Sequence, residues 1–227
     1  MTQKQLIELI QQHHSGMGET EVRLALNRAQ DDFCAKTELI TDTYTQNSVA
    51  GQRYYTLDAQ ILKILSVQVN DVEIPRLIGK PIIDDDEFDA ATGLTAPTSS
   101  SNERYWYTDN GRLGLVEKIT SAVTRDGKTS DYQSISVVKE IRMFTIAQAP
   151  DFTVDLAEIS SLPAQYHDAL VYKTIADGYL KAGMQEFSPQ ASQLFDVKYL
   201  ELVKDGKKQA RSQYLSGGST IVAPTDF

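Results

Sequence analysis

The residue types that most often carry out chemistry are few in this sequence and stand far apart. It holds three histidines and one cysteine in 227 residues. His13 and His14 are adjacent, so on a helix their side chains point about 100° apart and do not easily share a metal ion. We interpret them as polar residues at a helix end. His167 is expected in a core or interface, and Cys34, with no histidine tied to it, as a small buried apolar residue.

The acidic run Asp84-Asp85-Asp86-Glu87 is the clearest candidate for a cation site. Calcium loops space their oxygen ligands and place a glycine at the bend, and this run does neither, so a solvated loop is favoured. The sequence also has no Gly-rich phosphate loop, no GxSxG, no HExxH and no CxxC motif. We therefore expect no enzyme, no cofactor and no metal. Paired carboxylates for sugar hydrolysis stay open, because the fold sets their separation.

A basic cluster near the C-terminus is the strongest candidate for binding. Lys204, Lys207, Lys208 and Arg211 recur at spacings of three and four residues and therefore share one face of a helix. They could complement the negative end of the helix dipole. They could equally form an electrostatic docking surface for an acidic partner or a passing phosphate chain, and the sequence leaves both interpretations open.

The overall charge and composition limit the class of protein. There are 22 basic and 31 acidic side chains, a net charge of -9, which argues against a broad grip on nucleic acid. A single cysteine excludes an intrachain disulfide and favours a reducing compartment such as the cytoplasm. Neither a signal peptide nor a membrane-spanning run is recognisable, so we expect a soluble chain with no membrane partner.

Helical periodicity appears at both ends of the chain. Thr2 and Gln5 have capping-box spacing at the start of a short first helix. A second helix begins near Thr20, and further helices follow Pro163 and residue 189. The residues expected on buried helix faces are Val22, Leu26, Ala29 and Phe33, then Ala169, Tyr172, Ile175, Ala176, Tyr179 and Leu180, then Ala191, Leu194, Phe195 and Leu202.

The middle of the chain is β-prone. Residues 41–58 predict strand, turn, strand; turn signals stand at Asn70-Asp71 and Asn110-Gly111; and residues 84–102 predict an exposed loop. We expect an α+β fold in which terminal helices form an antiparallel helical bundle around a β-rich insertion. The expected bounds are 1–40 and 160–213 for the two parts of the bundle, 41–159 for the inserted domain, and 214–227 for an extended C-terminal docking tail.

The C-terminal tail combines a hinge with apolar residues. A Ser-Gly-Gly stretch at 216–218 precedes side chains that would cost free energy if left in water, about 25 cal/mol per Å². A disordered terminus is the alternative. We expect the tail to dock on a partner surface through Tyr214, Leu215, Ile221, Val222, Pro224 and Phe227.

The order of these parts resembles the head-to-tail adaptor (connector, or neck) proteins of tailed bacteriophages. The resemblance rests on a helix pair, then AGQRYYTLD, ILKILSVQVN, DNGRLGL and IAQAP, then LPAQYHDALVYKTIADGYLKAG and a closing helix. Asp58 stands where such proteins often have proline after the YxL segment.

The resemblance implies a structural virion protein of the head-tail junction. Such subunits assemble as a ring homo-oligomer, usually of twelve copies, beneath the portal protein. The ring extends the channel through which dsDNA passes without specific binding, and it provides the attachment platform for tail or nozzle proteins. An acidic channel wall would repel phosphates and let the genome slide.

Two other functions remain possible on the sequence alone. A tail-associated cell-wall hydrolase would need two carboxylates in one cleft. A carbohydrate-binding module could stack sugars on Tyr105, Trp106 and Tyr107. Since successive side chains of a strand alternate between faces, at least one of these rings is expected in the core, and a core or interface role is favoured for the triplet.

Overall fold

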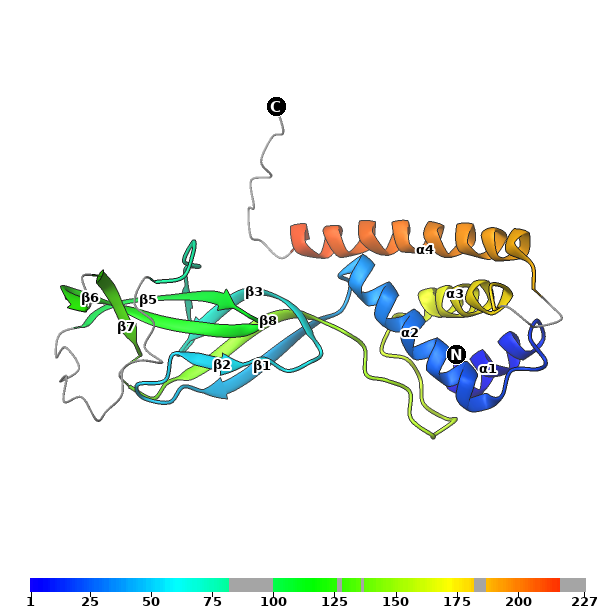
Figure 1. The fold of residues 1–227 in the computed structure, drawn as a ribbon, viewed down its shortest axis with the longest axis horizontal. Helices are drawn as coiled ribbons and strands as arrows, with labels where there is room; N and C mark the ends of the chain where they lie inside the picture. The colour runs from blue at the N-terminus through cyan, green and yellow to red at the C-terminus, as the bar shows by residue number, and fades with distance from the viewer. Residues whose placement is uncertain (82–99, 126–127, 136, 182–186, 217–227) are drawn as a thin grey trace, which may run out of the picture. The chain divides into compact units, whose positions relative to one another are not determined.

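The computed structural model describes residues 1–81, 100–125, 128–135, 137–181 and 187–216. It divides into two compact units (Figure 1): a helical unit, Met1–Thr41 with Ile146–Phe227, and a β unit, Asp42–Thr145. Helices and strands thus both contribute, which confirms the mixed α+β class. Residues 146–159, expected with the β-rich insertion, group with the helices. Within the described ranges, no helix combines the length and apolarity needed to cross a bilayer.

The helical unit is built from α1 (Gln3–Gln11), α2 (Glu19–Thr37), a short 3-10 turn (Ala164–Tyr166), α3 (His167–Tyr179) and α4 (Pro189–Ser216). The predicted capping box begins α1: Thr2 Oγ1 accepts from the Gln5 amide, and the Gln5 side chain accepts from the Thr2 amide at 2.9 Å. These bonds satisfy donors that the first helical turn leaves unpaired.

The core of the helical unit follows the predicted stripe of α2. Val22, Leu26, Ala29 and Phe33 are all buried, together with residues of α1, α3 and α4. Gln30, which is not part of this apolar stripe, is also fully buried. Hydrophobicity alone does not identify a buried amide that has hydrogen-bond partners.

The β unit contains two four-stranded sheets. One has the order β1-β8-β3-β4, formed by Thr41–Asn47, Glu140–Ala147, Ile61–Val69 and Val72–Ile74. The other has the order β2-β6-β5, formed by Tyr54–Thr56, Arg112–Arg125 and Ser100–Asp109, and β7 (Lys128–Ser134) also pairs with β6. Side chains from both sheets form one apolar cluster, including Val67, Met143, Trp106 and Leu115.

Two tight turns of the β unit follow the sequence signals. Asn70 and Asp71 have φ of 50° and 60° between β3 and β4, and Asn110 and Gly111 have φ of 48° and 71° between β5 and β6. Positive φ at both central residues defines the hairpin turn that matches strand twist, so both turn predictions are confirmed. The two strands expected in residues 41–58 also form, but they pair with β8 and β6 rather than with each other.

Candidate interaction surface

One side of α4 anchors this 28-residue helix to the rest of the helical unit. Tyr199 donates its hydroxyl to Asp32 Oδ2 at 2.7 Å. At Gly206 a Cβ atom would lie 2.8 Å from Thr37 Cγ2, so the missing side chain lets α4 approach α2 closely. The buried residues of α4 are Ser192, Tyr199, Val203, Gly206 and Ala210.

The opposite side of α4 exposes the predicted basic residues. Lys204, Lys207, Lys208 and Arg211 are all exposed. Lys208 lies 3.0 Å from Asp205, whereas no ion pair joins the other three to an acidic side chain of the described residues. None of the four stands in the last turn of α4, where the helix dipole acts most strongly. This placement favours the docking interpretation over the dipole interpretation.

Apolar residues continue this exposed side toward the N-terminus of α4. Leu194, Val197 and Leu200 are 57%, 55% and 53% exposed, so the predicted burial of Leu194 was wrong. The buried line passes through Ser192 and Tyr199 instead, which rotates Leu194 outward. We call the exposed side the outer stripe, comprising Leu194, Val197, Leu200, Lys204, Lys207, Lys208 and Arg211. Sequence reasoning found its basic half and missed its apolar half, although the three-residue spacing of 194, 197 and 200 was visible.

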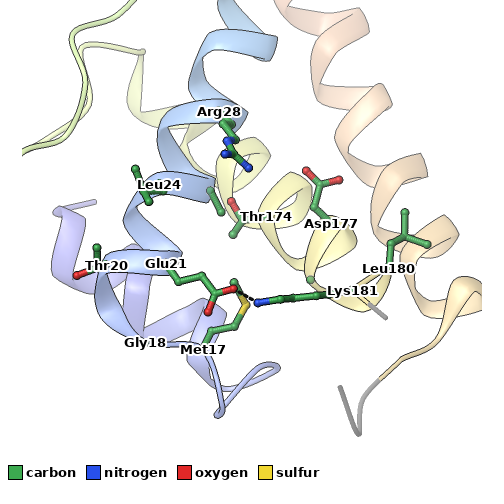
Figure 2. A pocket seen from close by; sticks show the side chains of 12 residues that line it. Met17, Gly18, Thr20, Glu21, Leu24, Arg28, Thr174, Asp177, Leu180 and Lys181 are labelled. Atoms are coloured by element: carbon green, nitrogen blue, oxygen red, sulfur yellow. Dashed lines mark hydrogen bonds and ion pairs between the residues drawn. The ribbon is translucent and has the colours of Figure 1, made fainter. Parts of the chain in front are cut away.

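A groove runs between α2 and α3 (Figure 2). The cavity holds about 720 Å³ and has apolar walls that include Met17, Leu24 and Leu180. Leu24 and Leu180 are about half exposed, so the predicted burial of Leu180 was wrong. An ion pair between Lys181 and Glu21 links the two walls. We call this cavity the α2–α3 groove.

The predicted docking tail falls almost entirely outside the described residues. Tyr214 and Leu215 belong to the last turn of α4, and only their backbone is described. Ile221, Val222, Pro224 and Phe227 are not among the described residues, and neither is the run Asp84–Glu87. The binding role of the tail therefore stays a prediction.

The segment that follows β8 is held against the helices by hydrogen bonds from side-chain and backbone amides. Gln30 Nε2 donates to Pro150 O at 2.7 Å, and Asn27 both donates to Phe152 O and accepts from its amide. The Gln3 backbone amide donates to Glu158 O at 2.7 Å. We call residues 150–160 the pinned segment. No sequence signal was recognised for it, although amides at positions 27 and 30 on a packed helix were a clue.

The chemistry-bearing residues are mostly enclosed. Burial raises the pKa of the Cys34 thiol to about 11, so this side chain is a core residue, as predicted. His167 is buried, as predicted. His14, expected as a polar helix-end residue, is also buried, and its Nε2–H donates to Ile175 O at 3.0 Å. Within the described ranges, no three His, Cys, Asp or Glu side chains are grouped to hold a metal ion.

The aromatic triplet does not form a sugar-stacking platform. Trp106 and Tyr107 are buried on opposite sides of β5, and Tyr105 packs edge-on against Tyr132. The predicted core role of the triplet holds for two of its three rings.

The carboxylates of the α2–α3 groove are also engaged. Glu21 pairs with Lys181, and Asp177 pairs with Lys173 at 2.8 Å. No observation on these two carboxylates favours the hydrolase alternative.

A long helix that presents an apolar and basic face to solvent is typical of proteins that bind other macromolecules. The family model described as SU10 adaptor protein matches residues 1–222. The chain belongs to this family of bacteriophage adaptor proteins, in agreement with the resemblance to head-to-tail adaptors. The proteins of this family are structural, and membership of the family suggests a location in the neck of the virion. Comparison with curated proteins gave no match.

Proposed function

We propose that this chain is the head-to-tail adaptor subunit of a tailed bacteriophage. Twelve copies form a ring beneath the portal protein, extend its channel and carry the tail or nozzle proteins. In this proposal the helical unit acts as an antiparallel bundle. The observation that carries the proposal is the family match over residues 1–222, and the outer stripe supports it because an assembly subunit needs unpartnered surface.

The charge of the chain suits a channel for DNA. A net charge of -9 disfavours adhesion of phosphates, so the genome passes without specific binding. A ring whose lumen was basic would contradict this part of the proposal.

The tail supplies a second attachment. Its apolar residues would add as a strand to a sheet edge or enter an apolar groove on the portal or on the next subunit. The α2–α3 groove is a candidate receptor on the next subunit, because its walls are apolar and open to solvent. A ring of such tails converts weak contacts into a strong attachment by raising the effective concentration of each.

The direct test is to mix the purified chain with the portal protein of the same phage and measure the mass by size exclusion with light scattering. We expect a complex of one portal ring with one ring of this chain. The mixture is the informative sample, because a free subunit can wait for the portal before it assembles. Separate elution at every salt concentration would contradict the proposal.

A further inference from the structure

The helical unit carries two surfaces of opposite charge on opposite sides. Figure 1 shows α4 along one side of this unit and the pinned segment reaching to the other side, with α2 between them. The outer stripe of α4 is apolar and then basic. The pinned segment carries three carboxylates and no basic side chain: Asp151, Asp155 and Glu158.

The pinned segment is held in one shape. Glu158 accepts from the Thr153 amide at 2.7 Å and from its hydroxyl at 2.5 Å, while Asp155 accepts from the Ala157 amide at 2.9 Å. Asn27 and Gln30 hold one end of this turn at Phe152 and Pro150, and Gln30 also accepts from the Ser160 hydroxyl at the other end at 2.6 Å. Val154, within this segment, is 78% exposed. A preordered apolar side chain loses little conformational entropy on binding, which favours association.

The two surfaces are complementary in charge, and both carry exposed apolar residues. Each combines an exposed apolar patch with charges: Leu194, Val197 and Leu200 beside the basic residues on α4, and Val154 beside the carboxylates on the pinned segment. Lys204, Lys207 and Arg211 have no acidic partner in ion pairs of the described residues. Charge complementarity of this sort selects a partner and its orientation.

We propose that the outer stripe of one copy binds the pinned segment of a second copy of this chain. Since the two surfaces differ and lie on opposite sides of the helical unit, the contact is head-to-tail, and repeating it yields a ring or an open helix. This inference rests on the proposed function for its ring, and it assigns the two faces that join neighbouring subunits. On α4 the apolar residues exclude water from one end of the contact, and the basic residues at the other end pair with carboxylates.

Charge reversal tests the contact in the full-length chain. The stripe variant carries Lys204→Glu, Lys207→Glu and Arg211→Glu, and the segment variant carries Asp151→Lys and Asp155→Lys. A third chain combines all five changes, and a control keeps the charge with Lys204→Arg, Lys207→Arg and Arg211→Lys. Sedimentation velocity over about 10 μM to 1 mM at low salt measures self-association, because a contact with a Kd of about 1 mM or less populates complexes in this range. Circular dichroism confirms that each variant is folded.

The expected results form a pattern. The stripe variant and the segment variant each associate at least about tenfold more weakly than the wild type. The combined chain regains association, because the reversed faces attract again, and the control equals the wild type. An equimolar mixture of the stripe and segment variants also regains association, because the intact stripe of one variant meets the intact segment of the other and the two reversed faces attract each other.

Other outcomes overturn the inference. If the wild-type chain stays monomeric up to about 1 mM, the proposed contact between copies is refuted. A stripe variant that binds the portal poorly while self-association is unchanged assigns the stripe to the portal. A stripe variant that only loses retention of duplex DNA assigns it to a phosphate chain. Self-association with the full pattern but without portal binding leaves this contact standing and refutes the proposed function instead.

Discussion

At the scale of single residues, His167 makes the stability of the helical unit depend on pH. Its ring is buried, Nε2–H donates to Leu162 O at 2.9 Å, and Nδ1 accepts from the Met1 ammonium group at 2.6 Å. Burial lowers the pKa of His167; the bond to Leu162 opposes the shift and the nearby ammonium charge reinforces it. The folded chain therefore holds this imidazole neutral.

A neutral, buried imidazole predicts a loss of stability in mild acid. The unfolded chain binds the proton more readily, so the stabilisation is complete above the ordinary histidine pKa of about 6.5 and is lost as pH falls toward the lower pKa of the folded state. We expect His167→Gln to cost about 1–3 kcal/mol at pH 8 and to flatten the decline between pH 7 and pH 5. Urea unfolding at several pH values measures both effects.

The matched control for this prediction is His13→Gln. His13 is exposed just beyond the end of α1, so this variant removes an imidazole that lies outside the buried core. If His167→Gln declined as steeply as the wild type, the neutral state of His167 would not be the cause.

Asp32 shows how one side chain joins three helices. Burial would raise the pKa of its carboxyl, but the hydrogen bonds from Lys36 on α2 and from Tyr199 on α4, with Lys173 of α3 nearby, outweigh burial and lower it. Tyr199 responds in the opposite direction, because burial and the bonded carboxylate both raise the pKa of its phenol. The pair thus favours a charged Asp32 and a neutral Tyr199 at neutral pH, which fixes α4 onto α2.

At the scale of elements, close packing of α4 on α2 depends on one glycine. A Cβ at Gly206 would lie 2.8 Å from Thr37 Cγ2 and 3.2 Å from Phe33 Cζ. Thr37 cannot rotate freely, since its hydroxyl donates to Phe33 O at 2.8 Å. The outer stripe therefore keeps its orientation only while this position stays without a side chain.

We predict that Gly206→Val destabilises the chain by about 2 kcal/mol, because overpacking forces the two helices apart. The control Glu201→Val places the same side chain on the exposed side of α4 and should change stability by less than about 0.5 kcal/mol. Urea unfolding midpoints of both variants measure the difference. Equal effects of the two substitutions would contradict the prediction that overpacking against Thr37 causes the loss of stability.

Local sequence signals predicted the helices, strands and turns themselves better than they predicted which of these elements lie next to one another. The stripe of α2 and the turn at Asn110-Gly111 depend on residues close in sequence, and both were found. The pairing of β1 with β8 joins residues about a hundred positions apart, and no spacing rule reports such a contact. Leu194 was misplaced for a related reason: the partners of Tyr199 on α2, and not hydrophobicity, set which side of α4 is buried.

The sequence predicted only part of the candidate interaction surface. Four basic residues at helical spacing were enough to indicate an exposed charged face. The pinned segment was not found, because its shape comes from Asn27 and Gln30, which contact it across more than a hundred residues of chain. The docking tail was predicted from composition, and its binding role stays a prediction.

At the scale of the whole molecule, the tail is predicted to serve attachment rather than folding. Deleting residues 216–227 should leave the melting temperature within about 2 °C of the wild type, since terminal residues rarely carry stability. Attachment to the portal should weaken by at least about tenfold, because each lost contact is multiplied around the ring. Calorimetry and co-elution with portal protein measure the two properties.

A full-length control separates apolar character from length. Changing Ile221, Val222 and Phe227 together to Ser keeps the tail and removes most of its apolar surface. We expect this chain to attach as poorly as the truncated one. Normal attachment of either chain would contradict the docking role of the tail.

Cys34 gives the molecule a practical property. The sequence has no other cysteine, and this one is fully buried in the helical core, with a pKa of about 11. Because only the exposed thiolate reacts quickly with maleimides, the native chain should stay unlabelled at neutral pH. A thiol introduced at an exposed position outside the outer stripe and the pinned segment, by Val72→Cys or Val137→Cys, would then accept a fluorophore selectively. Energy transfer between dyes could thus follow neighbouring subunits during virion assembly without first removing a native residue.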